Sequence, residues 1–508
     1  MSPTDFFAQL ELTPLLAQRM YYDQVNLWLW FRWVLYLFGG FFGVFPLIVA
    51  YMVLAERKLA ARFQDRIGPN RVGPFGLLQP FADFIKLIIK ECILPIGANS
   101  FVHLLAPMLT LISAFLVLAV IPFGIGLAPV DLPSGLLYMV SVSSISAMSI
   151  FLAGWSSRNK FSLLGAMRGV AQLVSYEIPQ VMSILPVILW AGSLSLVSIV
   201  QTQQYDQGWF LFSPPGMLGC MILLITSIAE VNRAPFDLPE AESEIIAGFH
   251  TEYSGMRFGL FFLGEYLNVF AVCCLITTLF LGGGSLPFQG YFAGEAQHML
   301  AAPFDASTQS VLKLNANHEF PANPGTGFRI KVTNIQGVSQ TFQVANRVGN
   351  DLVLMANRPL SFQAGVNSQV TASARQDYTG PWHFSNLIMI PVFMAKVFFL
   401  VFVMFWIRAT LPRVRVDRLM SFAWKTMVPL AIANIFLSAI WFEIVVRPAG
   451  GLQERIIGWV VTGPLTVLTV WFVFRLNRNS YKSNDPDRRP TLISRTGVSL
   501  LATSNQGG

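Results

Sequence analysis

Long apolar stretches recur along the chain and are separated by shorter polar segments. Each is about 17–25 residues long and carries few or no charges, which is the length a helix needs to cross the hydrocarbon core of a bilayer. The nine stretches comprise residues 33–54, 104–128, 136–155, 178–200, 209–229, 258–281, 384–407, 426–446 and 456–474. This pattern predicts an all-α polytopic membrane protein. Because the first stretch has no small-residue cleavage site, we expect it to be retained as an anchor.

Residues 285–383 interrupt this pattern with alternating apolar and polar positions. Segments such as 328–332 and 351–354 alternate residue by residue, and Asn, Gly and Pro separate them. Period-two alternation between turn residues is typical of β-strands. A partly ordered loop is the alternative, but so long a stretch without secondary structure is uncommon. We therefore expect a small β-rich extramembrane insert and assign it no chemistry.

The spans and the insert are expected to divide the chain into four parts. Residues 1–284 would form a membrane core with the first six spans, followed by the insert at residues 285–383. Residues 384–447 would add spans seven and eight, and residues 448–508 would hold a ninth transmembrane helix and a basic tail.

Basic residues mark one side of the predicted bundle. They lie in the loops after spans one, three, five and seven: Arg57, Lys58, Arg62, Arg66, Arg71, Arg158, Lys160, Arg168, Arg233, Arg257, Arg408, Arg413, Arg415, Arg418 and Lys425. The opposing loops 129–135 and 201–208 contain no Lys or Arg. Since cytoplasmic loops are enriched in these residues, we expect the N-terminus outside and the basic tail inside.

The composition excludes a soluble enzyme. Of the 508 residues, 54% are hydrophobic and only 12% are charged, against about 25% charged in an ordinary soluble domain. The net charge of +7 bears on membrane orientation rather than on nucleic-acid binding. None of the four cysteines, Cys92, Cys220, Cys273 and Cys274, forms a C-x-x-C pair, and no metal-binding or nucleotide-binding motif is present. Any redox cofactors are therefore expected on partner proteins.

The segment 55–91 predicts a short helix at the membrane surface. Glycines and prolines in 66–74 end the first helix. Apolar residues then recur at helical spacing at Leu77, Phe81, Phe84, Ile85, Ile88 and Ile89. The resulting amphipathic helix is too short and too charged to span. A surface anchor is the simpler interpretation, but Asp83 would form a site if the fold brings it to Arg57 and Arg66.

The loop AEVNRAPFDLPEAESEIIAGFHTEYSG, residues 229–255, is unusually acidic. Its carboxylates are Glu230, Asp237, Glu240, Glu242, Glu244 and Glu252. Asp237 and Glu240 have the spacing of a helix N-cap and its capping box. A solvated acidic loop is one interpretation. Since an acidic loop runs against the basic bias of this side, we favour a cluster that holds protons.

Ionisable residues also lie within or at the ends of spans, where each is a candidate for function. They are Glu177, Glu265, Lys396 and Glu443. Pro179 is expected to disturb the helix beside Glu177, and Lys396 could pair with one of the carboxylates. Glu443 could simply reach the membrane surface. A chain of carboxylates from the acidic loop into the bundle suits a proton path, and it equally suits a cation symporter.

Several of these segments resemble a known family. The motifs are ERK at 56–58, RIGPNRVGPFGLLQPFADFIKL, GVAQLVSYEIP, the acidic loop and LGEY at 263–266. They are similar to those of the H subunit (NuoH type) of respiratory complex I, the proton-translocating NADH:quinone oxidoreductase. The resemblance covers roughly residues 25–282 and 384–446. Membrane subunits of energy-converting hydrogenases belong to the same family and are the nearest alternative.

The resemblance implies an eight-helix core with an interfacial amphipathic helix, and a chamber for a quinone substrate. Residues that resemble the quinone passage are Arg57, Arg66, Asp83, Arg233 and Phe262. Residues that resemble the proton-path carboxylates are Glu177, Glu230, Glu240, Glu242, Glu244, Glu252 and Glu265. The resemblance also implies FMN and iron–sulfur clusters on partner subunits, contacts with a hydrophilic and a membrane arm and with lipid, and a bacterial inner membrane.

Two features exceed the family pattern, namely the insert at 285–383 and the ninth span with its tail. An ion-coupled secondary transporter remains a further alternative, although such proteins often contain internal repeats, and no motif occurs twice here.

Overall fold

The computed structural model describes residues 43–124, 128–204, 208–239, 247–287, 384–446 and 452–483, together with strand segments between 295 and 373. The chain forms two compact units, Met1–Lys86 and Leu87–Gly508.

The first unit contains helix α4 and the start of helix α5. Helix α4 spans Phe45–Phe63, the 3-10 turn η2 spans Pro74–Gly76, and α5 spans Gln79–Ile89. Gly76 adopts a φ of +76°, and a Cβ there would lie 2.3 Å from the Pro69 carbonyl oxygen, so this tight turn requires glycine. The predicted amphipathic helix corresponds to α5. Of the first predicted span, residues 33–42 lie outside the described residues.

The second unit contains a bundle of apolar helices. Among the residues that the structure describes, seven helices are long and apolar enough to cross a membrane, and α11 is a shorter apolar helix. The helices are α6 Ser100–Leu118, α7 Gly135–Ser143, α8 Ile145–Ser156, α9 Lys160–Ala191, α10 Leu196–Thr202, α11 Pro214–Glu230, α13 Gly255–Phe280, α15 Phe384–Thr410, α16 Val416–Phe422, α17 Val428–Trp441 and α18 Leu452–Ser483. Short 3-10 turns span Phe210–Phe212 (η4) and Gly248–His250 (η5), and π-helical turns span Ala423–Met427 (η6) and Phe442–Val446 (η7). The predicted polytopic all-α architecture is confirmed.

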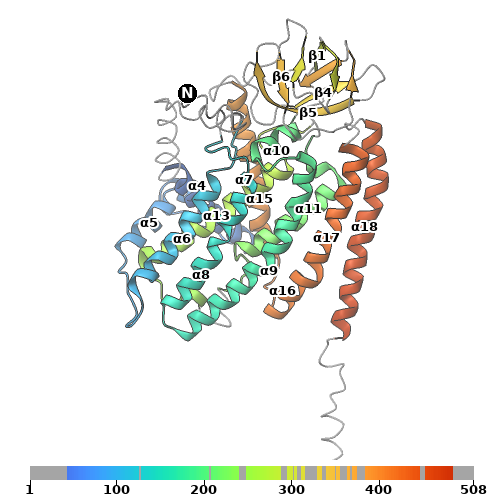
Figure 1. The fold of residues 1–508 in the computed structure, drawn as a ribbon. Coiled ribbons are helices and arrows are strands. Elements are labelled where there is room, and N and C mark those ends of the chain that lie inside the picture. Colours follow the sequence, from blue (N-terminus) through green and yellow to red (C-terminus); the bar gives the residue numbers. More distant parts are fainter. Residues whose placement is uncertain are drawn as a thin grey trace, which may run out of the picture. The chain divides into compact units, whose positions relative to one another are not determined.

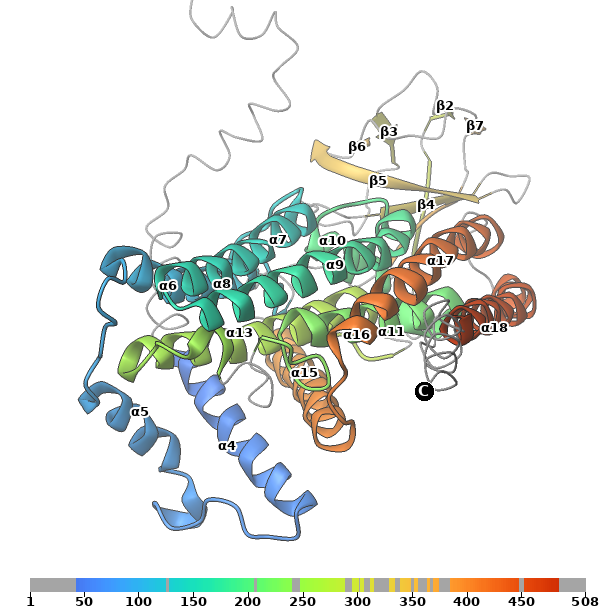
Figure 2. The same ribbon diagram turned by 90° about the horizontal axis from the view of Figure 1, so that it is seen from below.

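Helices α9 and α13 organise the bundle (Figures 1 and 2). Helix α9 packs against α8, α11 and α17, while α13 packs against α6 and α15. Helix α18 packs against α17 and α11. Buried apolar residues from α6, α8, α9 and α13 form a common core that includes Ala106, Ile150, Ala166 and Phe261. The bundle thereby holds the ends of α11 and α13 against α9.

Helix boundaries differ most from the prediction in α9. The predicted span begins at residue 178, whereas α9 begins at Lys160 and continues through Pro179 and Pro186. The part of α9 before residue 178 contains Arg168, Gln172 and Glu177, and these polar residues conceal the helix from a search for uncharged stretches. The expected disturbance at Pro179 does not end the helix, so Glu177 lies in the interior of a helix of 32 residues.

The insert is β-rich, as predicted. Its strands are β1 Glu295–Met299, β2 Phe304–Asp305, β3 Val311–Lys313, β4 Arg329–Thr333, β5 Ser339–Val348, β6 Asp351–Leu354, β7 Gln363–Ala364 and β8 Gln369–Ser373. Six form an antiparallel sheet in the order β1-β8-β4-β5-β6-β3, and β2 pairs with β7. A bridge between Leu300 and Leu314 joins the chain beyond β1 to the chain beyond β3. Alternate residues such as Ile330 and Val332 are fully buried in the core of the insert.

Candidate functional site

A buried glutamine fixes the chain that follows α11. The Gln172 side-chain amide of α9 donates hydrogen bonds to the carbonyl oxygens of Ala229, at 2.7 Å, and Phe236, at 2.6 Å. Gln172 itself is fully buried. Because both acceptors are backbone atoms, this contact sets the path of the loop and the position of Glu230, the last residue of α11.

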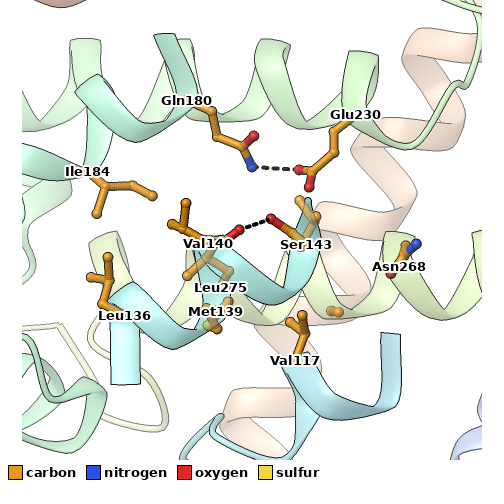
Figure 3. A pocket seen from close by; sticks show the side chains of 12 residues that line it. Val117, Leu136, Met139, Val140, Ser143, Gln180, Ile184, Glu230, Asn268 and Leu275 are labelled. Carbon is orange, nitrogen blue, oxygen red and sulfur yellow. Dashed lines mark hydrogen bonds between the residues drawn. The ribbon is translucent and has the colours of Figure 1, made fainter. Parts of the chain in front are cut away.

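Glu230 borders an internal cavity of about 40 Å³ (Figure 3). The Gln180 amide of α9 donates a hydrogen bond of 2.5 Å to the Glu230 carboxylate, and Ser143 and Asn268 also line the cavity. The remaining lining is apolar and includes Val117, Leu136, Met139, Val140, Ile184, Ala271, Val272 and Leu275. Since one water molecule needs roughly 10–15 Å³, this cavity has room for water beside a carboxylate.

Glu230 also borders a second cavity of about 20 Å³. Its polar lining includes Thr110, Ser146 and the carboxylate-bearing Glu265, and both Glu230 and Asn268 border it as well. Glu230 and Asn268 therefore form a wall that the two cavities share. The lining residues of the two cavities thus extend from Glu265 to the apolar side chains around the first cavity.

Glu265 of α13 lies between two basic side chains. Its carboxylate is 3.5 Å from Arg233 Nη2 and 3.2 Å from His250 Nε2. Only 12% of the Glu265 side chain is exposed. Arg233 also stacks on the ring of Tyr266, with its guanidinium carbon 4.1 Å from the ring centroid, and lies 6.0 Å from that of Phe262. The Arg233 guanidinium is a permanently charged partner for this carboxylate, whereas His250 carries a charge only when it is protonated.

Glu177 lies on the same face of α9 as Gln180, three residues further on. The Ser144 hydroxyl, at the break between α7 and α8, donates a hydrogen bond to the Glu177 carboxylate. Glu177 is also close enough to Glu230 to interact with it electrostatically. The helical spacing in α9 thus brings Glu177 and Gln180 to the same region as the end of α11.

Two other carboxylates of the acidic loop, Glu252 and Asp237, have structural partners. Asn159 donates a hydrogen bond of 2.7 Å to Glu252, and Arg413 forms an ion pair of 2.7 Å with Asp237. Next to Glu252, burial raises the pKa of Tyr253 to about 12, so its hydroxyl stays protonated. Glu240, Glu242 and Glu244 lie outside the described residues, and with them the predicted capping box of Asp237.

The first unit brings two of the predicted quinone-passage residues together. Arg57 Nη1 of α4 lies 2.6 Å from Asp83 Oδ2 of α5, and Gln79 donates a hydrogen bond to the same carboxylate. Arg66 instead donates a hydrogen bond of 2.7 Å to Gln64. The side chains of Arg57 and Asp83 are 47% and 33% exposed, so the pair lies at the surface of this unit.

Lys396 does not pair with a carboxylate in the described part of the chain, which corrects that expectation. Its ammonium group donates to the carbonyl oxygens of Leu281, Gly283 and Ser285.

Glu443 lies in η7, at the end of α17. Within the described residues, no group of three or more His, Cys, Asp and Glu side chains is placed to hold a metal ion.

Gln180, Asn268, His250 and Ser144 are the site residues that the sequence analysis missed. A signal was available for two of them, because Gln180 follows Glu177 and Asn268 follows Glu265 by three residues, which places each pair on one helix face. His250 lies within the conspicuous acidic loop, but its contact with Glu265 depends on the path of that loop. Nothing in the sequence pairs Ser144 with Glu177.

Comparison with known proteins gives consistent matches over most of the chain. The sequence model of the NADH dehydrogenase family matches residues 37–439. The H subunit of the NADH-quinone oxidoreductase of Dehalococcoides mccartyi strain CBDB1 is 40% identical over 409 residues, covering 80% of this chain and 86% of the relative. The corresponding H subunit of Geobacillus kaustophilus is 38% identical, covering 79% and 95%. NADH-quinone oxidoreductase subunit 8 of Rhodothermus marinus is 38% identical, covering 78% and 92%.

Proposed function

The chain belongs to the NADH dehydrogenase family as a membrane subunit of the NADH-quinone oxidoreductase complex, and we propose that it couples quinone reduction to proton translocation. In this proposal it also helps to form the chamber that binds quinone. Protons move through a chain of carboxylates from this chamber towards the interior of the helical bundle.

The observation that carries the proposal is the pair of cavities that share Glu230 and Asn268 in their linings. Glu265 borders one cavity, Glu230 and Asn268 border both, and Gln180 holds the Glu230 carboxylate from the other side. Carboxylates separated by spaces that accommodate water can exchange protons without large movements of the backbone. A membrane anchor would need neither the buried carboxylates nor the cavities between them.

The chemistry of the site supports a role in coupling. Reduction of a quinone to a quinol consumes electrons and protons, and it changes the charge near the chamber. The Arg233 guanidinium stabilises the ionised form of Glu265, and a protonated His250 would do the same. A change of charge that moves Arg233 or deprotonates His250 would weaken that stabilisation and favour proton uptake by Glu265. Because Glu230 interacts electrostatically with Glu177, protonation of one member of the chain would alter the next.

Quinone binding is assigned to the residues that resemble the quinone passage of the family. Arg57, Arg66 and Asp83 of the first unit, and Arg233 and Phe262 of the second, are the proposed contacts. Arg233 and Phe262 are neighbours in the structure, and Arg57 pairs with Asp83. A guanidinium beside aromatic rings suits a ligand with a polar carbonyl head and an apolar tail.

The remaining parts of the machinery are proposed to lie on partner subunits. FMN and iron–sulfur clusters belong there, in a hydrophilic arm that contacts the basic and acidic loops of this chain. The distribution of Lys and Arg supports an orientation with the N-terminus outside and the C-terminus in the cytoplasm of a bacterial inner membrane. Other membrane-arm subunits and lipid would surround the bundle.

The proposal is tested by Glu265→Gln in the assembled complex. We expect NADH oxidation by a water-soluble electron acceptor to be unchanged, while NADH-driven quinone reduction and proton translocation fall together. Glu443→Gln is the matched control, because it removes a carboxylate that borders neither cavity. Full quinone reduction and full proton translocation in an assembled Glu265→Gln complex would overturn the proposal.

A further inference from the structure

Lys396 lies in a polar site that the quinone and proton chemistry does not use. The site is built by the five residues that follow α13, 281–285, and by the indole ring of Trp209. Lys396 Nζ lies 2.7 Å from the carbonyl oxygens of Leu281 and Gly283, and 2.5 Å from that of Ser285. It also lies 4.1 Å from the centroid of the Trp209 ring.

This geometry matches the charged form of the side chain. Three acceptors at hydrogen-bond distance need three N–H donors, which an ammonium group has and a neutral amine lacks. The face of an indole ring also attracts a cation. The three carbonyls and the ring thus satisfy the ammonium group without any carboxylate among the described residues.

Two consecutive glycines give residues 281–285 the backbone conformation that binds the ammonium group. Gly282 and Gly283 adopt φ values of +66° and +58°, a conformation that places the carbonyls of residues 281, 283 and 285 around one point. A Cβ on Gly282 would lie 2.7 Å from the Trp209 ring. Glycine is therefore needed both for the backbone conformation and for the approach of the indole.

The site is held in place independently of the lysine. The fully buried Gln203 accepts a hydrogen bond of 2.9 Å from the Gly282 N–H and donates one to the Thr278 carbonyl. Trp209 donates a hydrogen bond of 3.3 Å to the Ser285 hydroxyl, and the Gly283 N–H donates to the Thr277 carbonyl. A framework with this many separate contacts can survive removal of the ammonium group.

We propose that residues 281–285 and Trp209 form a binding site for a primary alkylammonium ion, and that Lys396 is its permanent, covalently tethered occupant. The occupant joins the end of α13 to α15 at the point where the chain leaves the bundle for the β-rich insert. Its role is to fix this junction, and it takes no part in proton transfer.

The test is chemical rescue in native membranes that contain the assembled complex. Lys396→Ala removes three methylene groups and the ammonium group, which n-propylammonium can replace atom for atom. We expect Lys396→Ala to lower the temperature at which the chain aggregates by several degrees, and n-propylammonium to restore it in a concentration-dependent way. Tetramethylammonium, which has no N–H donor, and n-propanol, which has no charge, should not restore it.

Two further variants complete the test. Lys396→Met fills the same space without a charge, so it should be destabilised and should not respond to n-propylammonium. Lys313→Ala removes an exposed lysine of the insert and should behave as wild type. A Lys396→Met chain as stable as wild type, or a Lys396→Ala chain that n-propylammonium does not stabilise, would overturn the proposal.

A measurement on the unaltered chain avoids any dependence on variants that fold poorly. Amine-directed methylation of native membranes, followed by peptide mass spectrometry, should modify Lys313 and leave Lys396 unmodified until the chain is denatured. Modification of Lys396 at the rate of Lys313 would show that its ammonium group is not held, and would contradict the proposal.

Discussion

Two buried polar groups, one within α13 and one packed against the residues that follow it, are satisfied in opposite ways. In the first half of α13, Glu265 lies beside Arg233 and His250 and borders a cavity that Glu230 and Asn268 also line. Beyond the end of α13, Lys396 makes three hydrogen bonds to carbonyls and contacts an aromatic ring. The first arrangement leaves space and alternative partners for a proton, whereas the second leaves the ammonium group no freedom. Buried charge therefore marks a coupling site only where the surroundings also permit a change of charge.

The largest expected effect comes from removing the carboxylate between the cavities. Glu230→Gln keeps the shape of the side chain but cannot hold or release a proton. We expect proton translocation by the assembled complex to fall at least about tenfold, since positioned acids and bases contribute factors of that order or more. Proton uptake by proteoliposomes measures this directly. Unchanged uptake would place Glu230 outside the path.

Making the boundary between the two cavities apolar should have the next largest effect on proton translocation. Asn268→Leu replaces a polar side chain that borders both cavities with an apolar one. We expect a several-fold loss of proton translocation with the complex still assembled, because water would be excluded from the junction. Asn434→Leu is the control, since the Asn434 amide is fully buried, borders neither cavity and makes no hydrogen bond within the described residues. If both variants lowered proton translocation equally, the cavities would not be part of the proton path.

The ion pair between Arg413, after α15, and Asp237 of the acidic loop should matter for stability rather than for coupling. Arg413→Gln would deprive the Asp237 carboxylate, whose side chain is 10% exposed, of its 2.7 Å partner. We expect the free energy of unfolding to fall by roughly 1–3 kcal/mol, measured by thermal unfolding of the purified chain. Arg415→Gln, on the same loop and exposed, should have little effect. A loss of proton translocation without a loss of stability would assign this ion pair to the coupling machinery instead.

The smallest expected effect on stability is at the surface pair of the first unit. Arg57→Gln breaks the ion pair between Arg57 and Asp83, whose side chains are 47% and 33% exposed, respectively. Such pairs contribute less than about 1 kcal/mol, so the unfolding temperature of the purified chain should barely change. An effect on the KM for quinone in the assembled complex would then report on binding alone. A marked loss of stability would mean that the pair holds the fold of this unit.

Hydrophobic patterning predicted the membrane helices and the β-rich insert, because both depend on periodicity along the chain. It misplaced the start of α9, since Arg168, Gln172 and Glu177 are polar although the helix continues through them. The acidic loop and the isolated ionisable residues identified Glu230 and Glu265, because their chemistry is unusual in a membrane. The partners of Lys396 could not be predicted, since they are backbone carbonyls that have no signature in the sequence. The cavities were equally invisible, because they arise from the packing of α6, α7, α8, α9, α11 and α13.

The central claim is that quinone reduction changes the protonation of Glu230. Infrared difference spectra of the assembled complex, with quinone oxidised and reduced, report this change in the region of the carboxylic C=O stretch. We predict a redox-dependent band that disappears in Glu230→Gln and remains in Glu443→Gln and Lys396→Met. A spectrum that Glu230→Gln leaves unchanged would contradict the account.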